Sequence, residues 1–90
     1  MKRYYISQLT EGIQLDGVPF VVLKKSLGMS KNGKSSLTLT LGDKTGSILA
    51  RRWDYEGGEV STGTVYEVSG RVIIYNNNIE IALDRLTPAS

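Results

Sequence analysis

Apolar and polar residues alternate with a period of two over much of the chain, which is the pattern of half-buried β-strands. The clearest stretch is residues 36–41, Ser-Leu-Thr-Leu-Thr-Leu, where the leucines would face a core and the hydroxyl side chains the outside. Four further strands are expected at residues 18–29, 47–53, 65–75 and 79–86. The pattern therefore predicts an all-β chain of five short strands.

Glycine and asparagine separate these strands and mark the turns. Turns are expected at residues 30–34, 42–46 and 75–78, because Asn-Gly and asparagine-rich stretches readily adopt the positive φ values of tight hairpins. Inside the strands, Gly28 predicts a bulge or sharp bend and Gly70 permits strong bending. Residues 6–12 support one helical turn, with Ser7 as the expected N-cap.

The short strands fit a small, partly open barrel, since closing a sheet removes its exposed edges. We expect residues 1–90 to form one domain, with 1–12 as an N-terminal extension, 13–87 as the barrel and 88–90 as a tail. On the fourth strand, we expect Tyr66, Val68, Val72 and Ile74 on one face, with Gly70 between them.

The third strand contains one conflict with simple alternation. If Ile48 and Ala50 point inward, then Leu49, Arg51 and Trp53 point outward, and Arg52 faces the core. Arg52 then either lies at the barrel rim with its charge extended to water, or the strand carries a bulge.

The composition argues against catalysis. The chain has no histidine and no cysteine, which removes the commonest general base, the commonest metal ligand and the thiolate nucleophile. The remaining carboxylates read as a solvated surface, with Asp54, Glu56 and Glu59 in a glycine-rich loop and Glu80 and Asp84 on the fifth strand. We expect a binding protein with no catalytic residues, no metal and no cofactor.

Residues 28–35, Gly-Met-Ser-Lys-Asn-Gly-Lys-Ser, match the phosphate-loop pattern G-x-x-x-x-G-K-[ST]. That loop works because a helix begins at its Lys-Ser end and directs amide groups at the phosphates. Here the following residues alternate as a strand, so we reject nucleotide hydrolysis.

Basic residues are concentrated in the middle of the chain. Between residues 24 and 52 there are seven lysines and arginines and a single acid, Asp43. This asymmetry suits a polyanion, although solubility lysines at loop tips would give the same count. No apolar stretch has the length of a membrane span or of a signal peptide, so a cytoplasmic location without membrane contact is expected.

Binding a single strand needs a basic groove for phosphates and aromatic faces for bases. Trp53 and Arg51 share the outward face of the third strand, and Thr38 and Thr40 are their expected neighbours. Lys31 and Lys34 lie at the tip of one hairpin, and Tyr75 and the asparagines 76–78 lie at the tip of another.

Several of these residues also have a structural interpretation. Trp53 could cap the open end of the barrel, and Tyr75 could be a cross-strand partner. Arg51 and Arg71 could form ion pairs with Glu80 or Glu67.

Residues 37–54, LTLTLGDKTGSILARRWD, resemble the core of nucleic-acid-binding OB domains of the anticodon-binding and replication protein A types. With residues 6–12 before it and 68–72 after it, the chain is most similar to the N-terminal OB domain of bacterial 3′–5′ exoribonucleases that carry a C-terminal HD domain. The resemblance implies a five-stranded Greek-key OB-fold barrel that holds a single strand while a separate domain cuts it.

The resemblance also implies roles for individual residues. Trp53 takes the place of the base-stacking aromatic residue, with Leu49 and Arg51 beside it, and the turn containing Asn77 matches the second contact loop. Two departures stand out: residues 55–64 are short and glycine-rich where the family has a helix, and Leu49 stands where many relatives have a polar residue.

The leading hypothesis is therefore binding of single-stranded RNA or DNA, with a C-terminal catalytic domain or a protein as a further partner. A protein-interaction module is the alternative, using an apolar patch of Leu49, Ile73, Trp53 and Tyr75. Oligosaccharide binding is a third hypothesis, because aromatic platforms and asparagine amides also suit sugars.

Overall fold

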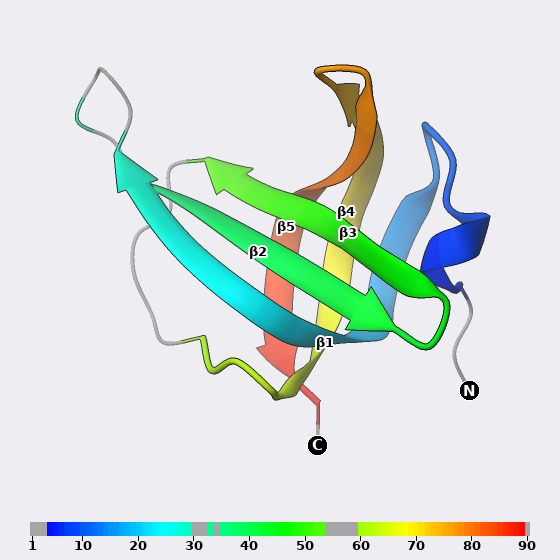
Figure 1. Ribbon diagram of the computed structural model, residues 1–90, viewed down its shortest axis with the longest axis horizontal. Coiled ribbons are helices and arrows are strands. Elements are labelled where there is room, and N and C mark those ends of the chain that lie inside the picture. The colour runs from blue at the N-terminus through cyan, green and yellow to red at the C-terminus, as the bar shows by residue number, and fades with distance from the viewer. Residues whose placement is uncertain (1–3, 30–32, 34, 54–59, 90) are drawn as a thin grey trace.

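A computed structural model describes residues 4–29, 33, 35–53 and 60–89 of the chain. Within these ranges the elements are a 3-10 turn η1 (Ile6–Gln8) and the strands β1 (Gln14–Met29), β2 (Ser35–Asp43), β3 (Gly46–Trp53), β4 (Val65–Tyr75) and β5 (Asn78–Pro88). The all-β prediction is confirmed. The strands form a barrel in the order β1-β2-β3-β5-β4, and β1 also pairs with β4 (Figure 1). The barrel is thus closed, whereas we expected it to be partly open.

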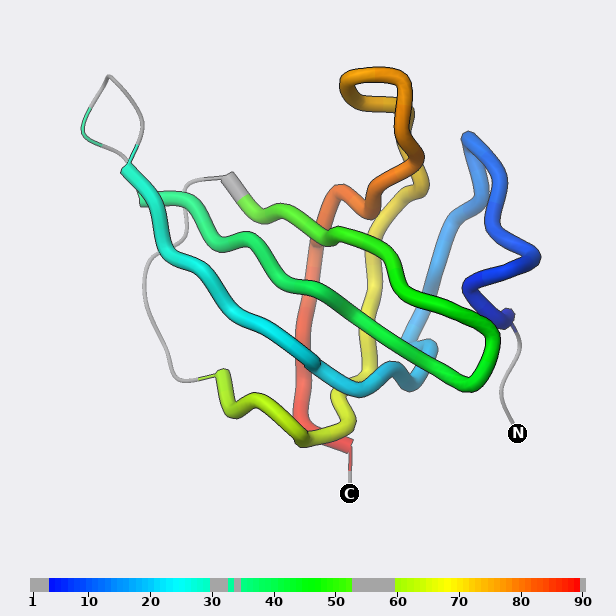
Figure 2. The backbone as a smooth tube through the Cα atoms, viewed as in Figure 1, coloured from blue at the N-terminus to red at the C-terminus, as the bar shows by residue number. Residues whose placement is uncertain are grey.

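Closure depends on a strong bend in β1. Its first half pairs with β4 up to Val21, and its second half pairs with β2 from Val21 onward (Figure 2). The register shifts between Val22 and Lys24, where the strand passes from one neighbour to the other. The bulge expected at Gly28 is wrong, because Gly28 pairs with Ser36 in an unbroken ladder. The irregularity lies instead between Val22 and Lys24, just after β1 stops pairing with β4 and starts pairing with β2.

The alternation of the second strand sets the core. Leu37, Leu39 and Leu41 are all buried, as predicted. They pack with buried side chains from the other strands, among them Phe20, Val22, Ala50, Val68, Val72 and Ile81. Of the predicted face of β4, Tyr66, Val68 and Val72 are buried, whereas Ile74 is half exposed. The reason is that β4 continues beyond the barrel into the β4–β5 hairpin, where Ile74 pairs with Ile79.

Gly70 marks a real irregularity in β4. The β4–β5 register shifts between Ser69 and Gly70, and a Cβ atom at Gly70 would overlap the backbone carbonyl of Ala82. The close approach of the two backbones requires glycine at this position, so the predicted bend is confirmed.

Arg52 lies at the barrel rim. The β2–β3 register runs without a shift from Asp43–Gly46 to Ser36–Trp53, so this pairing contains no bulge. The guanidinium of Arg52 donates to the carbonyl oxygens of Leu83 and Asp84 on β5. Of the two alternatives, the rim position is therefore right.

The N-terminal turn is held by the β2–β3 connection. The predicted helical turn is present, but Tyr5 and not Ser7 is the residue at its N-cap. Asp43 Oδ2 accepts a hydrogen bond from the Ile6 amide at 2.9 Å, and Thr45 Oγ1 accepts one from the Ser7 amide at 3.1 Å. The Asp-x-Thr-Gly stretch thus fixes the N-terminal segment to the barrel.

The largest differences from the expected strand bounds are at the start of β1 and at the end of β5. β4 has the predicted bounds, β1 begins four residues earlier and β5 continues to Pro88. At residue 35 a strand begins and no helix, which agrees with the rejection of a phosphate loop. Among the described residues, no helix is long and apolar enough to span a membrane.

Candidate nucleic-acid interface

Two rows of outward-facing residues cross the barrel from β4 to β1. Paired residues on neighbouring strands point to the same side of a sheet, so the strand register defines the rows. The first row is Arg71, Ala82, Arg51, Thr38 and Ser26, and the second is Ile73, Glu80, Leu49, Thr40 and Lys24. We call this surface the cross-strand face. It brings together five residues that the sequence singled out: Leu49, Arg51, Thr38, Thr40 and Arg71.

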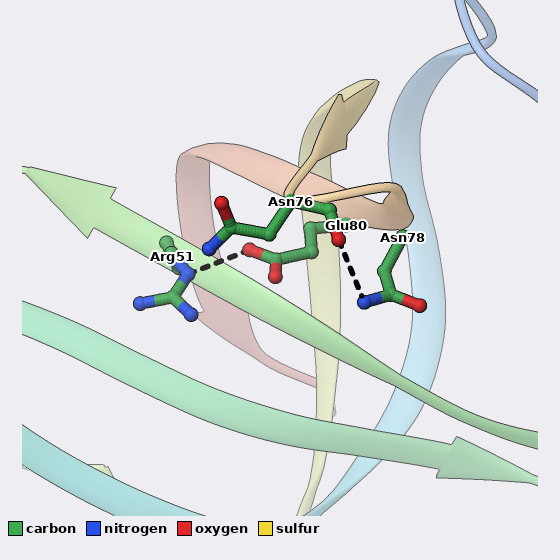
Figure 3. A network of polar contacts seen from close by, with 4 residues as sticks. All are labelled: Arg51, Asn76, Asn78 and Glu80. Atoms are coloured by element: carbon green, nitrogen blue, oxygen red, sulfur yellow. Dashed lines mark hydrogen bonds and ion pairs between the residues drawn. The ribbon is translucent and has the colours of Figure 1, made fainter.

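Arg51 is at the centre of the cross-strand face (Figure 3). Its Nε donates to Glu80 Oε1 at 2.6 Å, and its guanidinium carbon lies 5.1 Å from the centre of the Tyr75 ring. The hydrogen bond to Glu80 raises the pKa of Arg51 further above its usual value. Arg51, which like other arginines is charged in a protein, is thus held in place from two sides.

Glu80 is buried, with only 4% of its surface exposed, and not solvated as we expected. The parallel pairing of β3 with β5 sets Glu80 opposite Leu49 and within reach of Arg51. A buried carboxylate needs a partner, which Arg51 provides. One of the ion pairs considered from the sequence, Arg51 with Glu80, is thus present.

The β4–β5 connection is a tight two-residue turn. Asn76 and Asn77 have φ values of 52° and 65°, which asparagine tolerates better than most residues and which type I′ hairpins require. Asn78 Nδ2 donates to the Asn76 carbonyl oxygen at 3.1 Å. The turn leaves Asn77 exposed at the tip and sets the Tyr75 ring beside Arg51, with Tyr75 42% exposed.

Other predicted residues lie outside this description. Lys31 and Lys34 fall outside the described residues, as do positions 54–59, where the family helix would be sought. The backbone of Trp53 ends β3 and pairs with Ser36, at the edge of the cross-strand face. Its side chain is outside the described part of the chain.

The structure adds residues that the sequence analysis missed. Lys24 and Ser26 join the cross-strand face through the register of β1 on β2. A pocket of about 350 Å³ lies beside Leu49, between β3 and the start of β5. It is lined by Thr40, Ser47, Ile48, Leu49, Asn78, Ile79 and Glu80. No local signal identifies this pocket, because its two walls come from strands that are distant in sequence.

Comparison with known proteins identifies the family. Residues 21–89 match the model of the OB-fold nucleic acid binding domain of the tRNA anticodon-binding type. The chain belongs to this family. The matched segment contains all five strands except the first residues of β1, so it includes the whole cross-strand face.

Individual relatives agree with this assignment. The chain is 34% identical over 83 residues to the 3′–5′ exoribonuclease YhaM of Bacillus subtilis, a match that covers 88% of this chain and 26% of the relative. The YhaM exoribonuclease of Bacillus velezensis is 33% identical over 73 residues, covering 78% and 23%. The chain thus spans about a quarter of the length of these relatives.

A solved structure has the same fold over nearly the whole chain. The second OB-fold domain of replication protein A from Methanococcus maripaludis superposes with a TM-score of 0.69 at 30% identity. The match covers 94% of this chain and 92% of that domain. The OB fold and the suspected relation to exoribonuclease and replication protein A domains are confirmed.

Proposed function

We propose that this OB domain binds single-stranded nucleic acid, RNA or DNA, on the cross-strand face and performs no chemistry itself. The observation that carries the proposal is the stacked Tyr75–Arg51 pair at the centre of that face. An exposed aromatic ring backed by a fixed guanidinium offers a platform for a base, and stacking on such platforms tolerates any sequence.

The charges around the platform support the same function. Arg51 is neutralised by Glu80, so phosphates would be attracted by Arg71 and Lys24 at the two ends of the rows, and by Lys31 and Lys34. Thr38 and Thr40 offer hydroxyl groups between these cations, and Asn77 an amide at the hairpin tip. Among the described residues, no group of three histidine, cysteine, aspartate or glutamate side chains is placed to hold a metal ion.

We further propose that the domain holds the substrate of a nuclease-type protein. The support is the similarity to YhaM exoribonucleases, of which this domain corresponds to about a quarter. In such an arrangement a separate catalytic domain would cut the strand that this domain presents.

Trp53 provides the direct test, because it is the only tryptophan and ends β3 at the edge of the face. Titration with a short single-stranded RNA should quench its fluorescence, and the quenching should weaken as salt rises. A duplex of the same sequence is the control. An unchanged emission with the fold intact, together with no binding by anisotropy, would contradict the proposal.

A protein partner is the second candidate, and one observation favours it. Leu23, Leu27 and Met29 on β1 are 50%, 63% and 75% exposed, an unusual amount of apolar surface for one strand. If these residues serve a protein contact, light scattering will show a mass that rises with concentration. Leu27→Ser would then abolish the association and leave nucleic-acid binding intact.

A further inference from the structure

The pocket beside Leu49 has the composition of a base-reading site. Its lining includes the apolar residues Ile48, Leu49 and Ile79 and the polar residues Thr40, Ser47, Asn78 and Glu80. A volume of about 350 Å³ is at the small end of ligand pockets, which span about 300–1,000 Å³. It suits a single flat group better than an extended ligand.

Only one of the two carboxylate oxygens of Glu80 accepts a hydrogen bond within the described residues. Oε1 accepts from Arg51 Nε at 2.6 Å, while no hydrogen bond within the described residues involves Oε2. No buried side-chain oxygen among these residues lacks a partner, so Oε2 keeps some contact with solvent although the Glu80 side chain is only 5% exposed. A hydrogen-bond acceptor held in place by Arg51 therefore belongs to the lining of the pocket.

Asn78 adds a second acceptor to the same pocket. Its Nδ2 donates to the Asn76 carbonyl oxygen at 3.1 Å, which fixes the orientation of the amide and leaves Oδ1 without that bond (Figure 3). Figure 3 shows Asn78 and Glu80 projecting from the same hairpin, with Arg51 beside Glu80. The fixed groups of the pocket are thus acceptors, and only the hydroxyls can adapt.

We infer that this pocket takes one nucleobase and selects bases that carry an exocyclic amino group over uracil and thymine. The inference rests on the proposed binding of single strands. The strand backbone follows the cations at the ends of the rows, Arg71 and Lys24, and a base enters the pocket edge first. The N4 amino group of cytosine donates to Glu80 Oε2, as do the amino groups of adenine and guanine.

At the position of the cytosine amino group, uracil has an acceptor in place of a donor. Its O4 is an acceptor, and its only ring donor, N3–H, is flanked by two carbonyl oxygens that face the charge of Glu80. Replacing the hydrogen bond to Glu80 by a contact between two acceptors makes a difference of about tenfold or more in affinity.

Oligo(C) and oligo(U) of about twelve residues test the inference, because they share backbone and ring size and differ at the edge that Glu80 reads. Affinities measured by fluorescence anisotropy should favour oligo(C) by about tenfold. Glu80→Gln keeps an acceptor for Arg51 and offers an amide donor to O4, so it should abolish or invert the preference. Glu67→Gln removes the same charge from an exposed position on β4 and should leave the preference unchanged.

Each result decides a separate question. Equal affinity of the unaltered protein for the two oligonucleotides overturns the inference and leaves the proposed function standing. Equal strengthening of both by Glu80→Gln also overturns it, since Glu80 would then act only as a negative charge. Absence of binding to either oligonucleotide means that the proposed function itself has failed. The comparison with the unaltered protein needs no variant, so it holds even if Glu80→Gln does not fold.

Discussion

At the scale of residues, Arg51 has two structural roles that restrict its functional one. It neutralises the buried Glu80 and it lies against the Tyr75 ring. Its charge is therefore largely committed, and its contribution to a bound strand comes through the platform that it forms with Tyr75. Arg71 differs from Arg51 in this respect, because it is not paired with an acidic residue across the strands.

The first prediction concerns the stability role of Arg51. Arg51→Ala leaves the Glu80 carboxylate buried without its partner and should lower the free energy of unfolding by about 1–3 kcal/mol. The cost stays below that of a fully buried pair because the Arg51 side chain is 31% exposed. Urea denaturation measures it. Adding Glu80→Gln to Arg51→Ala should recover part of the loss, and a double variant no more stable than the single one would refute this account.

The sequence predicts part of this site. Leu49, Arg51, Thr38 and Thr40 follow from strict alternation on two strands joined by a short turn, where pairing is local. The burial of Glu80 does not follow, because it depends on a parallel pairing of only three residue pairs between β3 and β5. Alternation correctly makes Glu80 outward-facing, but the pairing of β5 with β3 sets it beside Arg51, and its side chain is buried.

At the scale of elements, the β4–β5 hairpin determines the geometry of the site. Its turn orients Tyr75 and Asn78, and its irregularity at Gly70 lets the two strands approach closely. The sequence predicts both features, the turn from its run of asparagines and the bend from the glycine inside the strand. The signal at Gly28 was misleading, since an exposed glycine near the end of a strand needs no bulge.

The second prediction uses this pair of glycines. Gly70→Ala forces a Cβ against the Ala82 carbonyl and should destabilise the domain by about 1–3 kcal/mol. Gly28→Ala is the matched control, because the nearest atom there is the rotatable Ser36 hydroxyl at 3.2 Å. Its effect should stay within about 0.5 kcal/mol. Thermal unfolding compares the two, and equal effects would show that the close approach at Gly70 is unimportant.

At the scale of the whole molecule, one curved strand and one short parallel contact close the barrel. β1 serves two neighbours through its bend, and β3 meets β5 over three residue pairs. Closure places side chains from all five strands on the outer side of the barrel, with the cations Lys24 and Arg71 at opposite ends of the rows. The sequence predicted the strands and the fold, but closure and the pocket arise only from long-range pairing.

The third prediction follows from the position of these cations. The logarithm of the binding constant should fall linearly with the logarithm of salt concentration, by about 0.7 for each phosphate contacted. Arg71→Ala should reduce this slope by about 0.7, whereas Arg85→Ala, at a position that pairs with Ser69 and lies outside the two rows, should leave it unchanged. Anisotropy titrations at several salt concentrations measure the slope, and equal effects of the two variants would argue against a localised phosphate path.

The central claim is that a single strand binds the cross-strand face, and amide chemical shifts of the isotope-labelled domain test it most directly. Titration with a short single-stranded oligonucleotide should move the signals of Lys24, Thr38, Leu49, Arg51 and Tyr75, and leave those of Leu27 and Arg85 in place. Shifts confined to the exposed apolar residues of β1, or no shift at any residue with the fold intact, would contradict the account.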